Sequence, residues 1–576
     1  MFPCTWAFNY RAFLACFIFA VTVFGQPAAL TYDPSPFNFI GTIDDLTLDT
    51  AGGVLAGGTI TVNGITVTVP KNLLVTLPSV SVAWSELFDG GVPSLPLLGS
   101  VSWEATIFGN VVRGERIAGL IYIAQETTQL LQGFITSINM TTGHFHVSDL
   151  DCVLNDPLGR FGPAYTAHPL WTVDPDNPSV RSSTGFPLCI PRNSTDPECP
   201  LTNRPTDGNG NALTTFTFND PASISAGDPD PRIMVPLVVG DYITFSGTKV
   251  AGGLLAVYSL EANLGIYTAP GTKPAYITVE AAQYAIVVPD PTVEVGETRA
   301  TALATDPSTL IQWFAIDVNP CTGKSTERNL LLVKPRTAAP RGKTVFRLSK
   351  TDASPATRQV GFRYSTGTQP GPRGIIAGQF IQPVFDYVFP ELVSFGSPEV
   401  PNQFDLMPYL ASGSGPFVPG NLLSPPMASP TIVRQLSPWP GNLKPGAVAC
   451  PTITPTSSSA SSASATGSTT ESAEPSASAT VSSPAPSASA GGPQVIQILA
   501  ATTQNVRGTI TTSVNATTSS LTAQLFLAIA GGDAVSPQPM SNLGGGLFTM
   551  SITTKTKPTS VTVTSSEDAT PVTQTL

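Results

Sequence analysis

The chain has 576 residues, which is too long for a single hydrophobic core and predicts several domains. Only 12% of the residues are charged, whereas 50 glycines and 56 prolines mark many turns, so the composition favours an all-β protein over a helical one. The formal net charge of −11 argues against a nucleic-acid partner, because binding phosphates requires a basic face.

The first 25 residues have the pattern of a secretory signal peptide. Arg11 precedes an apolar segment at 12–24, and Gly25 stands where cleavage is expected, so Gln26 is the predicted mature start. An uncleaved anchor is the alternative, but the apolar segment is shorter than the ~20 residues that span a bilayer. The polar end at 565–576 lacks the apolar tail of a lipid-anchor signal. We therefore expect a secreted protein, extracellular or in the cell wall, whose mature chain has no membrane span.

The strongest local signal is Asn63-Gly64, which lies between alternating flanks at 59–62 and 65–69. This pair supplies the positive φ angles of a type I′ turn, so it predicts a β-hairpin. Residues 81–88 are expected to form a short helix or a bulged strand, and strands within 100–123 close this first unit.

Two stretches of the front half resemble each other. Residues 239–247 and 252–260 alternate apolar with small or polar side chains around a glycine-containing turn, which predicts a hairpin. A weaker copy lies at 105–110 and 114–121, and in both copies a Phe is followed one or two residues later by Gly. The repetition predicts a tandem of two related, small, OB-like β-barrels.

A segment at 156–231 makes the second unit longer than the first. It is rich in Pro, Asp and Asn and carries Cys189 and Cys199. Structureless loops of this length are uncommon, so we expect an extended surface loop stapled by a disulfide.

From residue 275 the pattern stays β but the repeat is lost, and strand-like segments up to about 395 predict one antiparallel sandwich or barrel. The following Pro- and Gly-rich segment has little periodicity and is expected to lie along that domain as an irregular strap. Residues 456–492 are nearly all Ser, Ala, Thr and Pro, which predicts a disordered, O-glycosylated stalk. Strand-like segments return at 495 with the spacing of a small sandwich.

The predicted organisation therefore has seven parts. They are a signal peptide at 1–25, barrel units at 36–125 and 126–270, a third β domain at 275–396, the strap at 397–455, the stalk at 456–492 and a C-terminal β domain at 493–576.

Two segments of the C-terminal domain, 539–548 and 560–566, resemble an immunoglobulin-like module at the end of uncharacterised secreted fungal and bacterial proteins. Residues 315–323 and 376–380 also resemble a secreted fungal family of β-rich proteins with a Ser/Thr-rich stalk. The resemblance covers roughly the last two-fifths of the chain. It implies an immunoglobulin-like sandwich at the C-terminus and implies no reaction.

The mature chain is expected to carry covalent cross-links and glycans. Five cysteines remain after signal removal: Cys152, Cys189, Cys199, Cys321 and Cys450. Outside the cell they are expected in disulfides, and because five is odd, two bridges and one free or intermolecular thiol are the simplest arrangement. The sequence leaves the pairing open. Glycosylation sequons stand at Asn139, Asn193 and Asn515.

His144 and His146 are spaced to project from one face of a predicted strand. With Asp149, Asp151 or His168 they could bind zinc or copper, for which imidazole and carboxylate are suitable ligands. Without a third ligand at motif spacing, a solvated strand face is favoured, so no metal or other cofactor is expected.

The sequence contains no recognisable catalytic motif. There is no Gly-x-Ser-x-Gly elbow, and none of the three histidines lies near a plausible nucleophile. A glycosidase needs only two carboxylates, for which Glu86, Asp89 and Glu104 are available. Trp84 and Trp103 are candidate sugar-stacking platforms, although core burial is favoured for both.

These patterns favour a non-catalytic, secreted glycoprotein that binds cell-wall polysaccharide or other extracellular glycans. A carbohydrate-active hydrolase in the front half and a purely structural wall protein are the alternatives.

Overall fold

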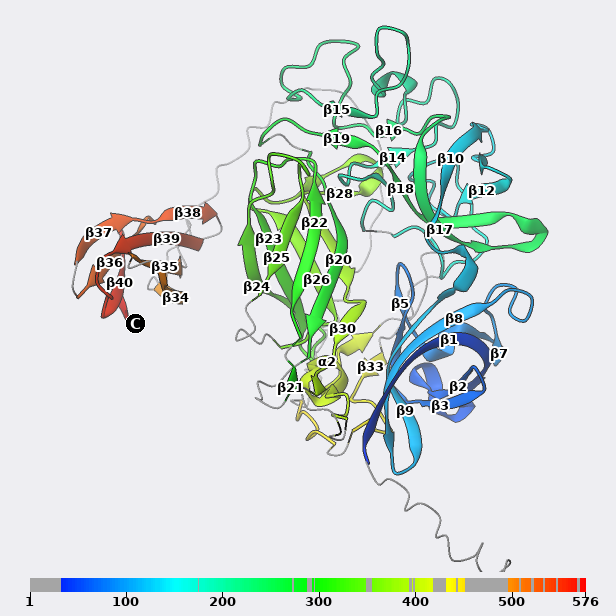
Figure 1. The fold of residues 1–576 in the computed structure, drawn as a ribbon, viewed down its shortest axis with the longest axis horizontal. Coiled ribbons are helices and arrows are strands. Elements are labelled where there is room, and N and C mark those ends of the chain that lie inside the picture. Colours follow the sequence, from blue (N-terminus) through cyan, green and yellow to red (C-terminus); the bar gives the residue numbers. More distant parts are fainter. Residues whose placement is uncertain are drawn as a thin grey trace, which may run out of the picture. The chain divides into compact units, whose positions relative to one another are not determined.

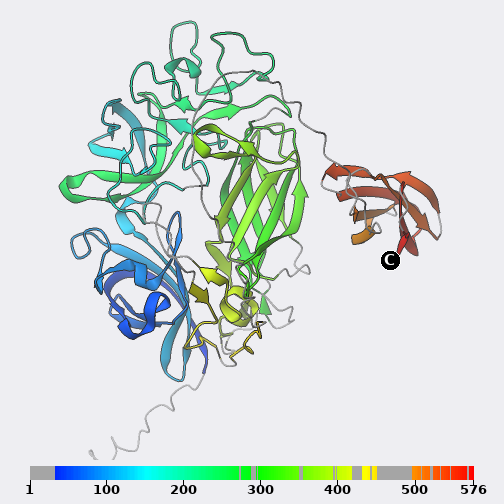
Figure 2. The ribbon, with the colours of Figure 1, turned by 180° about the vertical axis from the view of Figure 1, so that it is seen from behind.

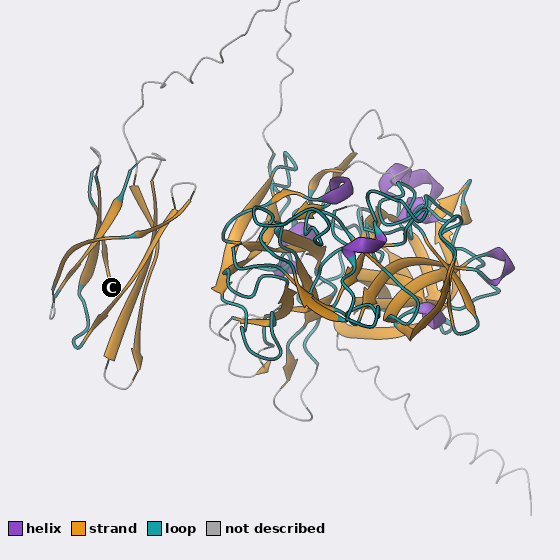
Figure 3. Cartoon of the chain, turned by 90° about the horizontal axis from the view of Figure 1, so that it is seen from above, coloured by secondary structure: helices purple, strands orange, loops and turns teal. Residues whose placement is uncertain are grey.

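The computed structural model describes residues 33–174, 176–271, 274–286, 293–294, 296–348, 355–392, 396, 399–417, 431–441, 444–450, 496–506, 509–518, 523–531, 534–544, 547–566 and 570–576. The predicted signal peptide and stalk lie outside these residues. The chain divides into two compact units, Met1–Thr454 and Pro455–Leu576. Strands dominate the described part of both units, which confirms the predicted all-β character (Figure 3).

Barrel 1 is a closed ring of five strands (Figure 1). These are β1 (Ser35–Leu48), β2 (Gly58–Val62), β3 (Ile65–Val69), β8 (Trp103–Val112) and β9 (Glu115–Gln125). They pair in the order β1-β2-β3-β9-β8 and back to β1, and only the β3–β9 contact is parallel. Asn63 and Gly64 have φ of 49° and 73°, so the predicted turn between β2 and β3 is confirmed. Between β3 and β8 the chain forms four additional short strands: β4 (Leu74–Thr76), β5 (Ser81–Ala83), β6 (Phe88–Asp89) and β7 (Val92–Pro93).

Barrel 2 repeats this arrangement. Its strands are β10 (Leu131–Ile138), β11 (Phe145–Val147), β12 (Leu150–Leu154), β17 (Tyr242–Lys249) and β18 (Leu255–Ala262). Their ring order is β10-β11-β12-β18-β17, again with a single parallel contact, between β12 and β18. The predicted tandem of small barrels is therefore confirmed, and the hairpins that suggested it are β8–β9 and β17–β18.

The insertion at 156–231 is more than the surface loop that its composition predicts. Its Phe161, Phe186, Leu188 and Phe218 are buried and extend the core of barrel 2. Short strands tie it to the barrel: β13 (Val180–Ser182), β14 (Leu188–Cys189), β15 (Thr215–Thr217), β16 (Val235–Pro236) and β19 (Gly265–Tyr267). The expected staple is present, because Cys189 and Cys199 form a disulfide.

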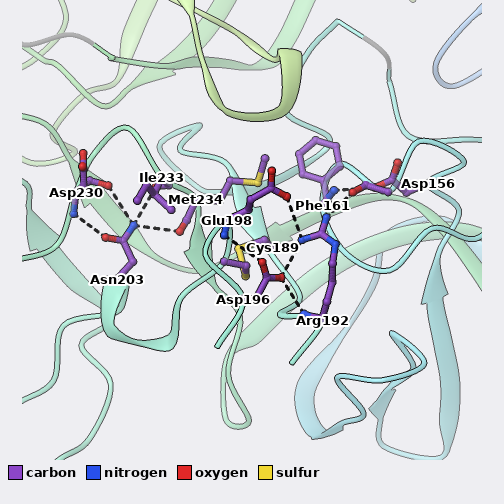
Figure 4. Close-up of a disulfide and its surroundings, with 12 residues drawn as sticks. Asp156, Phe161, Cys189, Arg192, Asp196, Glu198, Asn203, Asp230, Ile233 and Met234 are labelled. Carbon is purple, nitrogen blue, oxygen red and sulfur yellow. Dashed lines mark hydrogen bonds and ion pairs between the residues drawn. A yellow bond between two sulfur atoms is a disulfide. The ribbon is translucent and has the colours of Figure 1, made fainter. Parts of the chain in front are cut away.

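Polar contacts hold the stapled part of the insertion in place (Figure 4). The Arg192 side chain and backbone donate to Asp196 Oδ2 at 2.9 and 3.0 Å, and Phe161 N donates to Asp156 Oδ2 at 2.7 Å (Figure 4). Asn203 Nδ2 donates to three backbone carbonyls of residues 230–234. Side-chain groups thus satisfy the backbone polar groups that a long irregular segment exposes.

The third domain is a sandwich of two four-stranded sheets, seen beside the barrels in Figures 1 and 2. One sheet has the order β25 (Thr344–Arg347), β22 (Arg299–Ala304), β20 (Ile277–Ala285), β30 (Asp386–Val388). The other has the order β24 (Ser325–Val333), β23 (Ile311–Val318), β26 (Gln359–Tyr364), β29 (Gln379–Pro383). Trp313, Phe346 and Phe362 fill the space between the sheets. Small two-stranded pairings complete the domain: β21 (Val293–Glu294) with β31 (Glu391–Leu392), and β27 (Gln369–Pro370) with β28 (Ile376–Ala377).

The strap contains α2 (Pro408–Ala411), β32 (Gly415–Phe417) and β33 (Thr431–Val433). It contacts the domain that precedes it, and it also contacts barrel 1, which was not predicted. Asn402 N donates to Asn110 Oδ1 at 2.9 Å, and Asn110 Nδ2 donates back to Asn402 O at 2.9 Å. The Phe404 ring lies so close to Gly119 of β9 that a Cβ there would stand 2.3 Å from it. A Cys321–Cys450 disulfide joins the end of the strap to the sandwich.

The C-terminal unit consists of two four-stranded sheets. One has the order β34 (Ile496–Val506), β35 (Thr509–Thr518), β39 (Leu547–Thr554), β38 (Ser541–Gly544). The other has the order β37 (Val535–Pro539), β36 (Leu525–Ala530), β40 (Ser560–Ser565), β41 (Val572–Thr575). Apolar residues from both sheets, among them Val514, Leu527, Phe548 and Val563, form its core.

Helix is confined to single turns in the part of the chain that the structure describes. The 3-10 turns are Thr50–Leu55, Trp84–Leu87, Glu126–Thr128, Leu201–Asn203, Ala251–Gly253, Pro372–Gly374 and Phe404–Leu406. Among these residues no helix has the length and apolar character needed to cross a bilayer.

Candidate functional site

A cavity of about 590 Å³ lies where barrel 1, barrel 2 and the sandwich meet, and we call it the junction cavity. Its lining comes from β8 and β9 of barrel 1, β17 and β18 of barrel 2, and β29 of the sandwich. Residues 76–79 at the end of β4 and before β5, the segment that joins the two barrels, part of the insertion and Phe385 also line it. Its volume is within the ~300–1,000 Å³ of small-molecule sites, which are common at domain interfaces.

The alternation of β8 explains why polar side chains reach this cavity. Trp103, Ala105 and Ile107 face the barrel core, so Glu104 and Thr106 face outward into the space between the domains. β9 contributes Tyr122 in the same way, because its neighbours Ile121 and Ile123 are core residues.

Apolar side chains form part of the cavity wall. Phe385 is 39% exposed, and its ring centroid lies 6.2 Å from that of Tyr122. Leu130, between the barrels, is 73% exposed and has a φ of 52°, in the left-handed region that costs a branched residue about 1–2 kcal/mol. Leu130 N donates to Ser246 Oγ at 2.9 Å, which helps to hold this conformation. Leu130 and Phe385 thus expose apolar surface to the same cavity.

Asn177, another residue of the lining, connects the insertion to the sandwich. Its Nδ2 donates to Ile381 O at 2.6 Å, and Ile381 N donates to its Oδ1 at 3.0 Å. Asp174 accepts hydrogen bonds from the backbone N–H groups of Asp176 and Asn177 and from the Asn177 amide, so its carboxylate is fully engaged. Burial raises the pKa of Asp174, while these hydrogen bonds oppose that shift. Asp174 and Asn177 therefore position the wall.

Glu104 is the carboxylate in the cavity that remains available. No hydrogen bond or ion pair engages its side chain within the described ranges. Burial, and secondarily the negative charge of Glu126, raise the pKa of Glu104 above its ordinary value. Glu126 itself accepts a hydrogen bond from Thr42 Oγ1 at 3.3 Å. Glu104 can thus accept hydrogen bonds from a ligand, or donate one when it is protonated.

Replacing Glu104 with glutamine is expected to stabilise the protein at neutral pH. A carboxyl whose pKa is raised by folding destabilises the folded state above its unfolded pKa of about 4.3. The gain from Glu104→Gln should therefore be largest at pH 7 and disappear as the pH falls towards 4. Because Glu104 is only partly buried, we expect less than about 1 kcal/mol. Thermal unfolding of both proteins at several pH values measures this gain in stability. A loss of stability of Glu104→Gln at pH 7 would contradict the prediction.

The two histidines singled out from the sequence do come together, at Asp151 of β12. His144 Nδ1 lies 2.9 Å and His146 Nε2 lies 3.9 Å from Asp151 Oδ1. His146 Nδ1 also lies 3.0 Å from Ser137 Oγ. No cluster of three His, Cys, Asp or Glu side chains with metal-binding geometry occurs among the described residues. The observed geometry is a hydrogen-bonded group on an open strand face.

The other sequence candidates are structural. Trp84 and Trp103 are fully buried and donate to Thr47 O at 2.9 Å and Pro96 O at 2.8 Å, which confirms the favoured interpretation as core residues and excludes the alternative as sugar platforms. Glu86 lies away from the cavity and accepts from Ala83 N, and Asp89 is an exposed residue of β6. Of the three carboxylates proposed for a hydrolase, only Glu104 reaches the cavity.

The cysteines and sequons are placed as follows. The bridges are Cys189–Cys199 and Cys321–Cys450, while Cys152 is a free, buried thiol whose pKa burial raises to about 12. Two bridges and one free thiol are the predicted arrangement. Asn139 and Asn193 are exposed, and Asn515 lies in β35.

Comparison with protein-family models finds no match, and neither does comparison with curated proteins. The assignment of the site therefore depends on its geometry alone.

Proposed function

We propose that this protein is a secreted, non-catalytic binding glycoprotein whose ligand is a glycan of the cell wall or extracellular matrix. The observation that carries the proposal is the junction cavity, where exposed apolar side chains and unengaged polar groups face the same space. Two disulfides in the described part of the chain are consistent with an oxidising compartment.

The chemistry of the lining favours a neutral sugar. Phe385 and Tyr122 offer ring faces against which the C–H face of a pyranose can stack. Around them, Glu104, Gln382 and Ser259 supply donors and acceptors for hydroxyl groups. The lining also contains Arg181, but its guanidinium is paired with Glu261 at 3.2 Å. Among the described lining residues the unpaired charge is therefore the Glu104 carboxylate, which disfavours an anionic ligand such as phosphate.

The modular layout supports the same role. A five-stranded ring of this strand order is typical of the OB fold, which binds oligonucleotides and oligosaccharides, and the net charge of −11 favours the second class. We assign the C-terminal unit to an immunoglobulin-like module. The Ser- and Thr-rich segment at 456–492 would serve as a glycosylated spacer between the two folded units.

Retention on insoluble chitin, β-glucan and cellulose tests this function. We expect the secreted protein to bind one of them, and Phe385→Ala to weaken binding roughly tenfold, or about 1.4 kcal/mol, through loss of the ring face. Phe134→Ala is the matched control, because Phe134 is 59% exposed on β10 and lies outside the cavity lining. Failure to bind all three polymers would contradict the glycan ligand, and equal losses in the two variants would contradict the cavity as the site.

A hydrolase is the second candidate, and Glu104 is the observation that favours it. A carboxyl with a raised pKa facing a cavity is suited to act as a general acid. Hydrolysis requires a second carboxylate about 5–9.5 Å away, and Asp174, the other carboxylate of the lining, is bound within its own turn. Release of reducing sugar that Glu104→Gln abolishes would favour this candidate over binding alone.

A further inference from the structure

A second, smaller pocket adjoins the junction cavity, around the side chain of Arg358. This residue precedes β26, and Tyr122, Tyr387 and Tyr409 surround it from barrel 1, the sandwich and the strap. We call this group the tyrosine cage. Tyr122 and Thr76 line both cavities, so the cage and the junction cavity are neighbours.

Arg358 has no counter-charge among the residues that the structure describes. Within these residues no carboxylate oxygen lies within 4.0 Å of its guanidinium, and its buried Nη2 atom has no hydrogen-bond partner. The groups that act on it electrostatically are the three tyrosines, and burial is the main cause that lowers its pKa. Asp386 acts on Tyr122, but its Oδ2 already accepts from Gln283 at 2.5 Å.

The tyrosines cannot supply the missing negative charge as phenolates. Burial raises the pKa of Tyr122 and Tyr387 well above the ordinary value of 10, and that of Tyr409 is raised as well. Tyr387 donates to Thr357 O at 2.7 Å, and the hydroxyls of Tyr387 and Tyr409 lie 2.9 Å apart. An arginine remains protonated even when buried, and a buried, unpaired ion costs several kcal/mol.

The cage also encloses space. A cavity of about 20 Å³ lies against Arg358, Tyr387 and Tyr409, with Asn72 of barrel 1 at its edge. This space is small, so it favours a monatomic anion over the larger phosphate and sulfate. Tyr122 Oη lies 3.3 Å from Val384 O, a long hydrogen bond that its hydroxyl can exchange for a nearby anion.

We propose that the tyrosine cage binds a single halide ion, chloride under ordinary conditions, which neutralises Arg358. A water molecule would satisfy a hydrogen bond but would leave the charge uncompensated. The halide would lie at the contact of barrel 1, the sandwich and the strap, and would thus stabilise that contact. This site is independent of the glycan function.

Thermal and urea unfolding of the full-length protein in sodium chloride, bromide and gluconate at equal ionic strength tests the proposal. We expect higher stability in chloride and bromide, with the folding equilibrium constant rising up to tenfold for each tenfold increase in halide. Arg358→Met should abolish the difference between anions. Arg116→Met, which removes an exposed arginine of β9, should preserve it.

If Arg358→Met does not fold, anomalous diffraction from crystals of the wild-type protein grown in bromide tests whether a halide binds at Arg358. An anomalous bromide peak beside Arg358 Nη2 is the expected result. Density for water only at that position, or equal stability of the wild-type protein in chloride and gluconate, would overturn the proposal.

Discussion

Replacing Asp241 with asparagine is expected to destabilise barrel 2 by about 3–5 kcal/mol, because it leaves a buried arginine unpaired. Arg204 in the insertion and Asp241 at the start of β17 have side chains that are 2% and 3% exposed, and they are joined at 2.8 Å. Asp241 Oδ2 also accepts from Val238 N, and Arg204 Nε donates to Leu213 O. The pair therefore holds the insertion against the hairpin that closes the barrel.

Urea unfolding of the full-length protein measures this loss, and proteolysis within 205–232 shows whether the insertion is released. Glu280→Gln is the matched control. It breaks an exposed ion pair with Lys343, at 2.8 Å, and should cost no more than about 1 kcal/mol. The double variant Arg204→Met, Asp241→Leu should lose less than Asp241→Asn alone, because no unpaired charge remains. If Asp241→Asn loses as little stability as the control, the Arg204–Asp241 pair does not hold the insertion against the hairpin.

Removing the Cys321–Cys450 bridge is expected to have an effect of similar size. The bridge closes a loop with a sequence separation of 129 residues, for which loop-closure entropy alone predicts about 4–5 kcal/mol. It joins the turn between β23 and β24 to the end of the strap, next to the predicted stalk. We expect the Cys321→Ala, Cys450→Ala variant to unfold at lower temperature and to expose the strap near residue 450 to protease.

The Cys189→Ala, Cys199→Ala variant provides the comparison for the long bridge. Its loop has a separation of only 10 residues, so the entropic loss should be smaller, about 2–3 kcal/mol. Differential scanning calorimetry of both variants measures the two losses. If removal of the Cys189–Cys199 bridge costs more stability than removal of the Cys321–Cys450 bridge, the strap is held by its contacts with barrel 1 and the long bridge adds little.

The barrels could be predicted because the sequence patterns that indicate their hairpins lie within short stretches of the chain. The Asn63-Gly64 turn and the hairpin at Tyr242–Lys249 and Leu255–Ala262 depend on alternation and turn residues within about twenty positions. The contacts that close the rings, β3 with β9 and β12 with β18, are parallel pairings of distant strands. They could be inferred only from the repetition between the two halves.

The insertion and the strap were predicted less well, for physical reasons. The insertion is rich in Pro, Asp and Asn, so its composition gave no sign that Phe161, Phe186 and Phe218 are buried. Their burial comes from tertiary contacts with barrel 2. The strap has no periodicity, and its contact with barrel 1 depends on Gly119 accommodating the Phe404 ring. Neither the burial of these phenylalanines nor the contact of the strap with barrel 1 can be recognised in the sequence, because both depend on the three-dimensional arrangement of the elements.

The junction cavity could not be found from sequence, because its residues are far apart in the chain. In the sequence Glu104 could not be distinguished from Glu86 and Asp89 as a site residue. In the structure it lines the same cavity as Phe385, which comes almost three hundred residues later in the chain. The left-handed φ of Leu130 has no sequence signature, since leucine rarely adopts it. Burial of Trp84 and Trp103 was favoured by their size and is explained by the carbonyls that accept their N–H groups.

The most direct test of the account is a crystal structure of the secreted protein with oligosaccharides from the polymer that it binds, together with analysis of the sugars recovered from the crystals. We expect an intact oligosaccharide in the junction cavity, with one ring against Phe385 and a hydroxyl on Glu104. Density at another surface, or cleaved sugar in the cavity, would contradict the account.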